Sequence, residues 1–373
     1  MIYLLLSLIF IRPFISSLAF PYMDFLYSTV LLCVLALWVI LKRLPLEKVT
    51  PMLYPITAFF LAAVVSILFS LNKITSLSLI YRYITNIIIF VLCLCLSDKD
   101  KKRVIYTIVF AGFVISILSI YQYLFGFQHI LDYVARKNIT RPFILDYLGR
   151  RRVFFPFVTP NTLAGFLVML LPLALLINDK KKWFVIALIV TALSLTKSLG
   201  AFISLFLGMA LYLYLRKDRP GKKFFFLAMI VIIFAFIFIL RQLPGKEHTL
   251  PMFSFAKRID YWRETLKIFR LYPLTGVGIG NFNLPSTRYA HNSYLQVSAE
   301  MGIIGLLSLI WLVSSAMRTG LNQIKRSHNK NITICLVTSS SIFLIHNLMD
   351  FTFFLPEVSL IWWVILGLAI AKD

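Results

Sequence analysis

The stretch from Ala290 to Gly305 carries the densest set of groups that could act on a substrate. Its first polar side chain, His291, lies where a long apolar run would leave the membrane and meet water. A neutral imidazole has an ordinary pKa of about 6.5 and accepts a proton readily, so His291 is a candidate general base. The structural alternative is that His291 only caps the helix that follows. The sequence leaves both interpretations open.

The residues after His291 add a polar stripe to the same predicted helix, with Tyr294 beside it. At about 100° per residue, Asn292, Gln296 and Glu300 fall on one helical face. Such a stripe cannot face lipid without a substantial cost, so Glu300 is expected to be buried against protein or water. The stripe therefore predicts an interhelical hydrogen-bond network that supports the neighbouring histidine.

Cations gather in two long connections, at about 126–160 and 241–293, and could bind a polyanion. Guanidinium groups bind phosphate through paired hydrogen bonds and keep their charge. Arg152 ends an arginine triplet, Arg258 lies in the second connection, and Lys197 lies where two apolar runs meet. Contact with anionic lipid headgroups explains the same charges equally well. Charge alone does not separate a lipid-linked pyrophosphate site from headgroup contact.

Residues 257–270 predict an amphipathic helix on the membrane surface. The apolar positions recur at helical spacing: Ile259, Trp262, Leu266 and Phe269. The opposite flank carries Arg263, Lys267 and Arg270. These flank cations fit headgroup contact, whereas Arg258 falls at the edge of the apolar stripe and is the better candidate for a ligand.

Two further motifs are weaker. The glycine-rich run from Pro273 to Phe282 resembles a phosphate loop superficially, but it follows no strand, so a tight turn with exposed N–H groups is the better interpretation. The four cysteines all lie inside apolar runs: Cys33, Cys93, Cys95 and Cys335. Their spacing does not suit zinc, and no carboxylate cluster marks the long connections. Neither a metal nor any other cofactor is predicted.

The elements that position these residues are membrane-spanning helices. The chain has 60% hydrophobic and 14% charged residues and a mean hydropathy of +0.86, which excludes a soluble fold. Strand-length alternation is absent, so the backbone can be satisfied in lipid only by helices. We predict one all-α polytopic membrane domain, 1–373, with about twelve spans. These are 2–20, 24–41, 53–71, 79–96, 104–125, 161–177, 183–197, 199–215, 224–240, 294–317, 331–349 and 354–371.

The charge of +23 is informative through its placement, which argues against a nucleic-acid partner. Short basic connections alternate along the chain at 42–48, 99–103, 180–182, 216–223 and 318–330. The positive-inside rule puts them in the cytoplasm, together with both termini. The first apolar run lacks a cleavage pattern and is read as a span. The two long connections, 126–160 and 241–293, are then periplasmic.

These pieces together resemble the O-antigen ligase and polymerase family of bacterial surface-polysaccharide enzymes. The matching motifs are an arginine eight residues before Pro160-Asn161, Arg258-x-x-x-Trp262, Gly276-x-Gly278-x-Gly280, and His291-Asn292-x-Tyr294-Leu295 with Glu300-x-Gly302. The resemblance covers nearly the whole chain. The chain departs from it in having Ser198-Leu199-Gly200 where the family often has Ser-Arg-Gly, which leaves Lys197 as the nearby cation.

The resemblance implies a metal-independent, inverting glycosyltransferase of GT-C-like architecture in the bacterial inner membrane. It would move a glycan from undecaprenyl pyrophosphate to an acceptor sugar on the periplasmic face. The implied partners are this lipid-linked donor, a lipid A-core or glycan acceptor, and membrane lipids. Arg152, Arg258 and Lys197 would bind the pyrophosphate, and His291 would act as the general base. The supporting residues would be Asn292, Tyr294, Gln296 and Glu300.

Other functions remain as alternatives. A polymerase would use the same chemistry with another lipid-linked repeat as acceptor, and the ligase is favoured because the His291-Asn292 signature and the amphipathic helix resemble that branch better. A flippase or other transporter also uses about twelve helices, but it predicts inverted repeats and broken mid-membrane helices, which the sequence does not indicate. A structural or adhesive role leaves the clustered arginines without a purpose.

Overall fold

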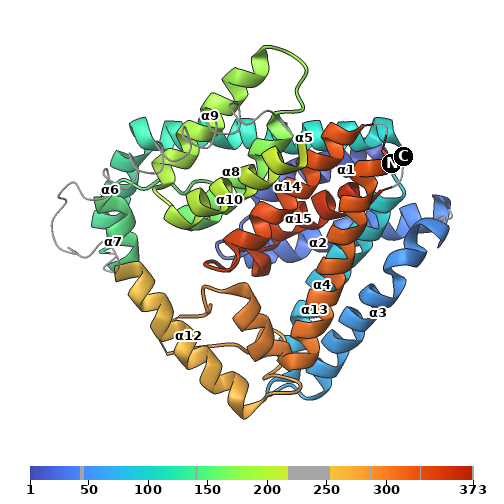
Figure 1. Cartoon of the computed structure of the whole chain (residues 1–373). Helices are drawn as coiled ribbons and strands as arrows, with labels where there is room; N and C mark the ends of the chain where they lie inside the picture. Colours follow the sequence, from blue (N-terminus) through green and yellow to red (C-terminus); the bar gives the residue numbers. More distant parts are fainter. Residues whose placement is uncertain (43–45, 139–141, 217–252, 286, 328, 372–373) are drawn as a thin grey trace.

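The computed structural model describes residues 1–42, 46–138, 142–216, 253–285, 287–327 and 329–371, and these are mostly helical (Figure 1). Within this part of the chain there is no sheet, and a single isolated bridge joins Leu284 to Thr287. The prediction of an all-α fold is therefore confirmed.

The helices follow one another with short connections. They are α1 (Ile2–Ile11), α2 (Pro21–Lys42), α3 (Leu46–Leu68), α4 (Lys73–Leu94), α5 (Asp98–Tyr121), α6 (Phe127–Arg136), α7 (Pro142–Gly149), α8 (Pro160–Ala174), α9 (Lys181–Thr196), α10 (Leu199–Arg216), α12 (Phe253–Leu271), α13 (Ser293–Arg326), α14 (Lys330–His346) and α15 (Pro356–Ile370). Three short turns of helix are η1 (Arg12–Phe14), η2 (Gln122–Gly126) and η3 (Thr352–Phe354).

Six helical segments of the described residues are long and apolar enough to cross a membrane. They are Pro21–Leu41, Val49–Leu68, Lys73–Leu94, Asp98–Arg136, Leu199–Arg216 and Ser293–Arg326. Four shorter apolar helices accompany them: Ile2–Phe14, Pro160–Ala174, Lys330–His346 and Pro356–Ile370. The polytopic class is confirmed, and the count of about twelve stays a prediction. The predicted span 224–240 lies outside the described residues.

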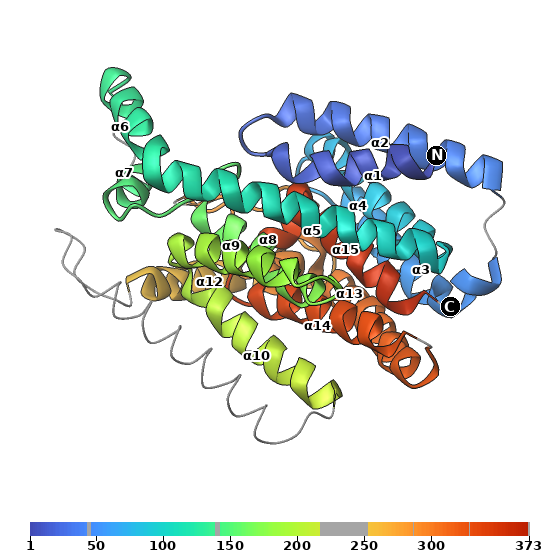
Figure 2. The ribbon, with the colours of Figure 1, turned by 90° about the horizontal axis from the view of Figure 1, so that it is seen from above.

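The two ends of the helical bundle differ in what they hold. At one end, Lys101 Nζ donates to the carbonyl of Ala371 at 3.3 Å, which places the start of α5 beside the C-terminal end. At the other end, the backbone N–H of Ser293 donates to the carbonyl of Asn347 at 2.9 Å. Figures 1 and 2 both show the termini close together and α12 far from them. We call the end that holds α12, the start of α13 and the end of α14 the distal end.

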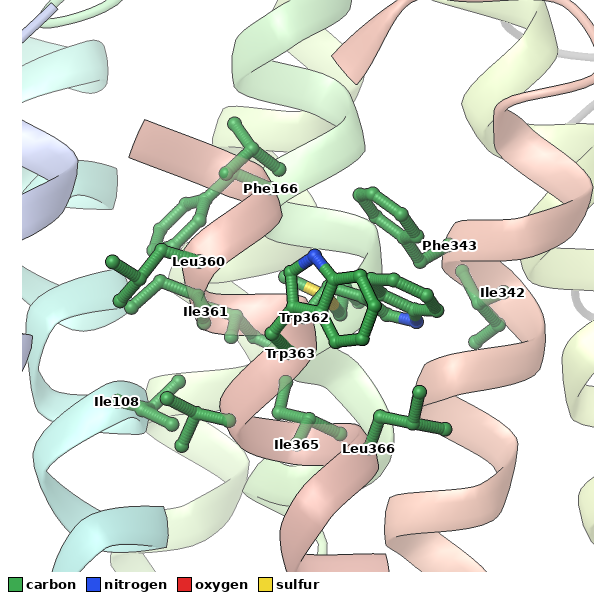
Figure 3. Close-up of a cluster of buried hydrophobic side chains, with 14 of the residues drawn as sticks. Ile108, Phe166, Ile342, Phe343, Leu360, Ile361, Trp362, Trp363, Ile365 and Leu366 are labelled. Atoms are coloured by element: carbon green, nitrogen blue, oxygen red, sulfur yellow. The ribbon is translucent and has the colours of Figure 1, made fainter. Parts of the chain in front are cut away.

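Helix α15 is the centre of the bundle, because every residue from Pro356 to Ile370 is buried. A helix that is apolar on all sides needs neighbours on all sides. Phe343 of α14 stacks on Trp362 with ring centroids 4.8 Å apart, and Trp362 contacts Trp363 at 5.0 Å (Figure 3). This aromatic packing fixes the distal ends of α14 and α15 relative to each other.

A buried ion cluster ties the N-terminal helices to α15. Arg12 donates to Asp24 at 2.6 Å and lies 3.6 Å from Glu357, and Arg82 of α4 binds the other oxygen of Asp24 at 2.8 Å. Buried charges persist in a membrane protein when they pair in this way. The cluster also explains why α1 ends at Ile11, well before the predicted limit of residue 20.

Helix α13 is interrupted at Gly302, where φ is +65° and ψ is −167°. The break frees backbone groups, and a glycine turn spanning residues 273–280 satisfies them. Val277 N–H donates to Ala299 O at 2.9 Å, Gly278 N–H donates to Glu300 O at 2.9 Å, and Ile303 N–H donates to Pro273 O at 2.8 Å. The interpretation of unbroken spans was wrong at this helix, because a positive φ at a glycine leaves no mark in an apolar pattern.

We expect Gly302→Ala to destabilise the protein by about 2–4 kcal/mol, because φ is unfavourable for alanine and a Cβ would overlap the carbonyl of Leu274. Thermal unfolding of the purified protein in detergent measures this. Gly149→Ala is the matched control, because no atom lies within 4 Å of the added Cβ. Equal unfolding temperatures for the two variants would contradict the role given to the break.

Candidate functional site

The backbone around His291 is fixed by the start of α13. Asn292 caps the helix, and its Oδ1 accepts hydrogen bonds from the N–H groups of Tyr294 and Leu295 at 3.0 and 3.1 Å. Ser293 Oγ donates to Asn347 Oδ1 at 2.7 Å and thereby joins α13 to the end of α14. His291 itself has φ +52°, a conformation that non-glycine residues rarely adopt outside turns and functional sites.

The imidazole of His291 lies in an aromatic surround. It stacks on Tyr261 with ring centroids 5.6 Å apart and meets the edge of Phe351 at 4.8 Å. Its Nδ1 atom is buried and has no hydrogen-bond partner among the described residues. Burial lowers the pKa of His291 to about 4, Asp350 opposes this shift, and Arg258 adds to it. The ring is therefore neutral at pH 7 and has a free lone pair.

Arg258 comes to this histidine on the inward face of α12. Thr265 on that helix is buried, and Tyr261 and Ile268 pack against a small cluster. The cluster consists of Phe282, Leu284, Ala290 and Ala299. Arg258 shares this face by its helical spacing from Tyr261 and Thr265. Its electrostatic effect on the pKa of His291 agrees with that placement.

The predicted apolar stripe of α12 is thus not its packing face. Leu266 of the stripe is 39% exposed, whereas Thr265 is fully buried. The face that packs contains a threonine and a tyrosine, so hydropathy alone points to the wrong side. The predicted distinction among the cations agrees with the structure, since Arg258 is partly buried while Arg263, Lys267 and Arg270 are exposed.

Two ionisable residues that the sequence reasoning missed complete this part of the site. His346 ends α14, and its Nε2 lies 3.9 Å from Asp350 Oδ2, with each side chain only 1% exposed. Asp350 Oδ1 accepts the N–H of Phe351 at 2.7 Å. The available signal was an ionisable pair, four residues apart, at the end of an apolar run, which is a functional hypothesis by default in a membrane protein.

Arg152 is held between the start of α8 and the end of α9. Its Nε donates to the carbonyl of Thr196 at 2.9 Å, and its Nη2 donates to Asn161 Oδ1 at 2.9 Å. The guanidinium also lies over the ring of Tyr147, 5.4 Å from the centroid. The spacing between Arg152 and Pro160-Asn161 therefore corresponds to a direct contact.

Lys197 follows α9 with φ +53°, and its Nζ donates to the carbonyl of Arg150 at 2.8 Å. Lys197 thus fastens the arginine triplet to the turn between α9 and α10. His346 lies between this region and His291, because a Cβ on Gly165 of α8 or on Gly200 of α10 would meet its ring at 2.7 and 4.0 Å. The distal end therefore gathers Arg152 and Lys197 on one side of His346 and Arg258 and His291 on the other.

The polar stripe of α13 links the loop to the glycine turn. Gln296 Oε1 accepts the N–H of Ala290 at 3.1 Å, and its Nε2 donates to Glu300 Oε1 at 2.9 Å. Glu300 Oε2 accepts the N–H of Gly280 at 2.8 Å. Tyr294 OH donates to the carbonyl of Leu344 at 2.9 Å. These bonds hold His291 indirectly, and the glycine N–H groups are used inside the protein.

The arrangement combines a neutral base with fixed positive charge. Such a pair can remove a proton from a hydroxyl while stabilising negative charge that develops nearby. In the part of the chain that the structure describes, no three His, Cys, Asp or Glu side chains are placed to hold a metal ion.

Comparison with known proteins adds a family. Residues 184–310 match a family model described as O-Antigen ligase. This range contains Lys197, Arg258, His291 and Glu300. A search of curated proteins finds no match to the chain. The resemblance seen in the motifs is confirmed over the matched residues.

Proposed function

Because residues 184–310 carry an O-antigen ligase domain in an all-helical membrane protein, we propose that the chain transfers a glycan from undecaprenyl pyrophosphate to a hydroxyl of an acceptor sugar. The observation that carries this proposal is the neutral His291 beside Arg258 at the distal end. Transfer from a pyrophosphate needs a base for the attacking hydroxyl and positive charge for the leaving group. This site offers both.

In the proposed reaction, Arg258 and Arg152 bind the pyrophosphate, with Lys197 as a third cation. His291 takes the proton of the acceptor hydroxyl as its oxygen attacks the anomeric carbon. The bond from that carbon to the phosphate oxygen breaks, and its electron pair leaves on the pyrophosphate, so the anomeric configuration inverts. Asp350 favours the protonated form of His291 and would stabilise the imidazolium as it forms.

The proposed reaction takes place on the periplasmic side of the inner membrane. The basic residue Lys101 contacts the carbonyl of Ala371, so a basic connection and the C-terminal end lie together, opposite the distal end. The positive-inside rule assigns that basic end to the cytoplasm. Both termini are then cytoplasmic, and the distal end faces the periplasm.

The acceptor decides between a ligase and a polymerase. We favour a ligase that uses lipid A-core, for the resemblance of the His291-Asn292 signature and of α12 to that branch. The test incubates the purified protein with an undecaprenyl-pyrophosphate glycan and either lipid A-core or a second lipid-linked repeat. A single addition to lipid A-core supports the ligase, whereas growth of the lipid-linked chain supports the polymerase.

The break in α13 is the feature that a transporter would also show. In transporters, the groups freed by such a break bind substrate or ions. Here Ala299 O, Glu300 O and the N–H of Ile303 are already bonded to the glycine turn. The break therefore serves the fold, and the enzyme remains the better proposal.

The pH dependence of kcat/KM should show the depressed pKa of His291. A base with a pKa of about 4 stays deprotonated from pH 7 down to pH 5.5, so activity should be nearly constant over that range. A histidine with an ordinary pKa of about 6.5 would be about 90% protonated at pH 5.5 and would lose activity about tenfold. Asp350→Asn should move the acid limb further down, because Asp350 raises the pKa. An acid limb centred near pH 6.5 in the unmodified protein would contradict the buried neutral base.

Transfer should survive metal removal, because arginine charge takes the role that a magnesium ion would have at a pyrophosphate. We expect the same turnover in EDTA as in buffer with added magnesium. Turnover that is lost in EDTA and restored by magnesium or manganese would show that the cations of the site are insufficient.

A further inference from the structure

A cavity of about 210 Å³ lies next to the proposed site. It is enclosed by α4, the glycine turn, η3 and the start of α15. Aromatic rings form much of its wall: Phe282, Tyr289, Phe353 and Phe354. Drug-sized ligands occupy pockets of about 300–1,000 Å³, so this smaller cavity has the size for a single sugar ring.

The cavity adjoins His291 through one pair of rings. Tyr289 of the wall stacks on Phe351 with centroids 4.1 Å apart, and Phe351 meets His291 edge-on at 4.8 Å. Gln296, which also lines the cavity, binds the N–H of Ala290, the residue before His291. A group bound in the cavity is thus one aromatic pair away from the proposed base.

Several polar groups that line the cavity have no partner in the described residues. The side chain of Asn86 is 8% exposed and that of Tyr83 is 9% exposed, yet neither the Asn86 amide nor the hydroxyls of Tyr83 and Tyr289 form a hydrogen bond there. Burial raises the pKa of Tyr289 to about 12, so its hydroxyl both donates and accepts at neutral pH. Buried polar groups are normally satisfied, and a set of them around one cavity indicates a ligand that satisfies them.

The two arginines of the cavity are placed differently. Arg82 is held by Asp24 at 2.8 Å through Nη2 and by the Tyr81 hydroxyl at 3.3 Å through Nε, which leaves Nη1 without a bond to described residues. Arg288 is exposed at the rim and has no hydrogen bond or ion pair to the described chain. Arg82 is therefore a pre-positioned donor inside the cavity, and Arg288 is a mobile donor at its entrance.

The mixture of donors and acceptors selects the ligand. Glu300 lines the same cavity, and a phosphate or carboxylate placed there would be repelled by it. Sugar hydroxyls both donate and accept, and the faces of sugar rings pack on aromatic rings. We propose that this cavity binds one neutral sugar residue of the acceptor glycan, through Arg82, Asn86, Glu300 and Arg288. The acceptor role rests on the proposed function, whereas the binding of a sugar does not.

Sugar binding can be tested without the transfer reaction. The probes are methyl glycosides of common neutral hexoses, detected by saturation-transfer NMR on the purified full-length protein. At least one glycoside should receive saturation, and Asn86→Leu and Arg288→Ala should abolish it. Arg263→Ala is the matched control, because Arg263 is exposed on α12 and does not line the cavity. Arg288→Ala also guards against misfolding, since it changes an exposed side chain.

Three outcomes of this experiment would overturn the proposal. They are the absence of binding by the unmodified protein, binding that both cavity variants retain, and displacement of the glycoside by inorganic phosphate. The acceptor role is tested separately in the transfer assay, where Arg288→Ala should raise the acceptor KM about tenfold and leave the donor KM unchanged, as expected for the loss of a charged hydrogen bond. An increase in the donor KM instead would assign the cavity to the donor. If the unmodified protein transfers no glycan, the proposed function fails while the NMR result still decides sugar binding.

Discussion

His291→Ala is expected to lower the turnover of glycan transfer by about 10²–10⁴-fold while donor binding stays nearly intact. The reason is the geometry of the imidazole, which is neutral, partly buried and fixed between Tyr261 and Phe351. A group that acts only by accepting a proton in the transition state contributes nothing to the binding of the donor. Turnover, donor affinity and thermal stability of the purified variant are the measurements that check this.

The control for this variant is His129→Ala, because His129 is exposed on α6 and has no part in the proposed site. The alternative, in which His291 only caps α13, predicts a lower unfolding temperature with turnover per folded molecule preserved. The cap is in fact made by Asn292, whose Oδ1 accepts two backbone N–H groups. A folded His291→Ala protein with near-normal turnover would end the assignment of the base.

Arg258→Lys is expected to weaken donor binding about 10- to 100-fold, which is the worth of a hydrogen bond between charged groups. Turnover should also fall, by about 10²–10³-fold, because the charge that develops on the leaving pyrophosphate loses a fixed donor. Lysine keeps the positive charge but cannot reproduce the planar fork. Donor affinity and turnover should therefore fall together, unlike in His291→Ala.

Arg263→Lys is the matched control for Arg258→Lys, because both arginines lie on α12 but Arg263 is exposed on the outer flank. Equal donor affinities for the two variants would remove Arg258 from the pyrophosphate site. A third readout is the acid limb of kcat/KM: Arg258 lowers the pKa of His291, so a neutral Arg258→Gln variant should move that limb to higher pH.

Hydropathy and charge placement predicted the fold class because both depend on contiguous stretches of sequence. The apolar runs that predict 79–96 and 294–317 coincide with α4 and α13, and the amphipathic stretch 257–270 lies within α12. His291 and Arg258 could be selected from their types and from the family motifs. Their proximity depends on how α12 packs against the loop before α13, which only the structure reveals.

The features that escaped prediction depend on partners far apart in the chain. Arg12, Asp24 and Glu357 form one cluster although residues 12 and 357 belong to opposite ends of the sequence. His346 and Asp350 were absorbed into an apolar run because their neighbours are apolar. The inward face of α12 was predicted wrongly, since Thr265 packs more tightly than Leu266. Each of these errors concerns a polar group whose cost of burial is offset by a tertiary contact.

The most direct test of the account is the transfer reaction itself, with purified protein, an undecaprenyl-pyrophosphate glycan and lipid A-core in detergent. The account predicts a new glycan–acceptor product and the release of one undecaprenyl pyrophosphate for each glycan transferred. The product should carry the inverted anomeric configuration, and both product and release should depend on His291 and Arg258. Donor that binds but stays intact with lipid A-core and with a second lipid-linked repeat alike would contradict the central claim.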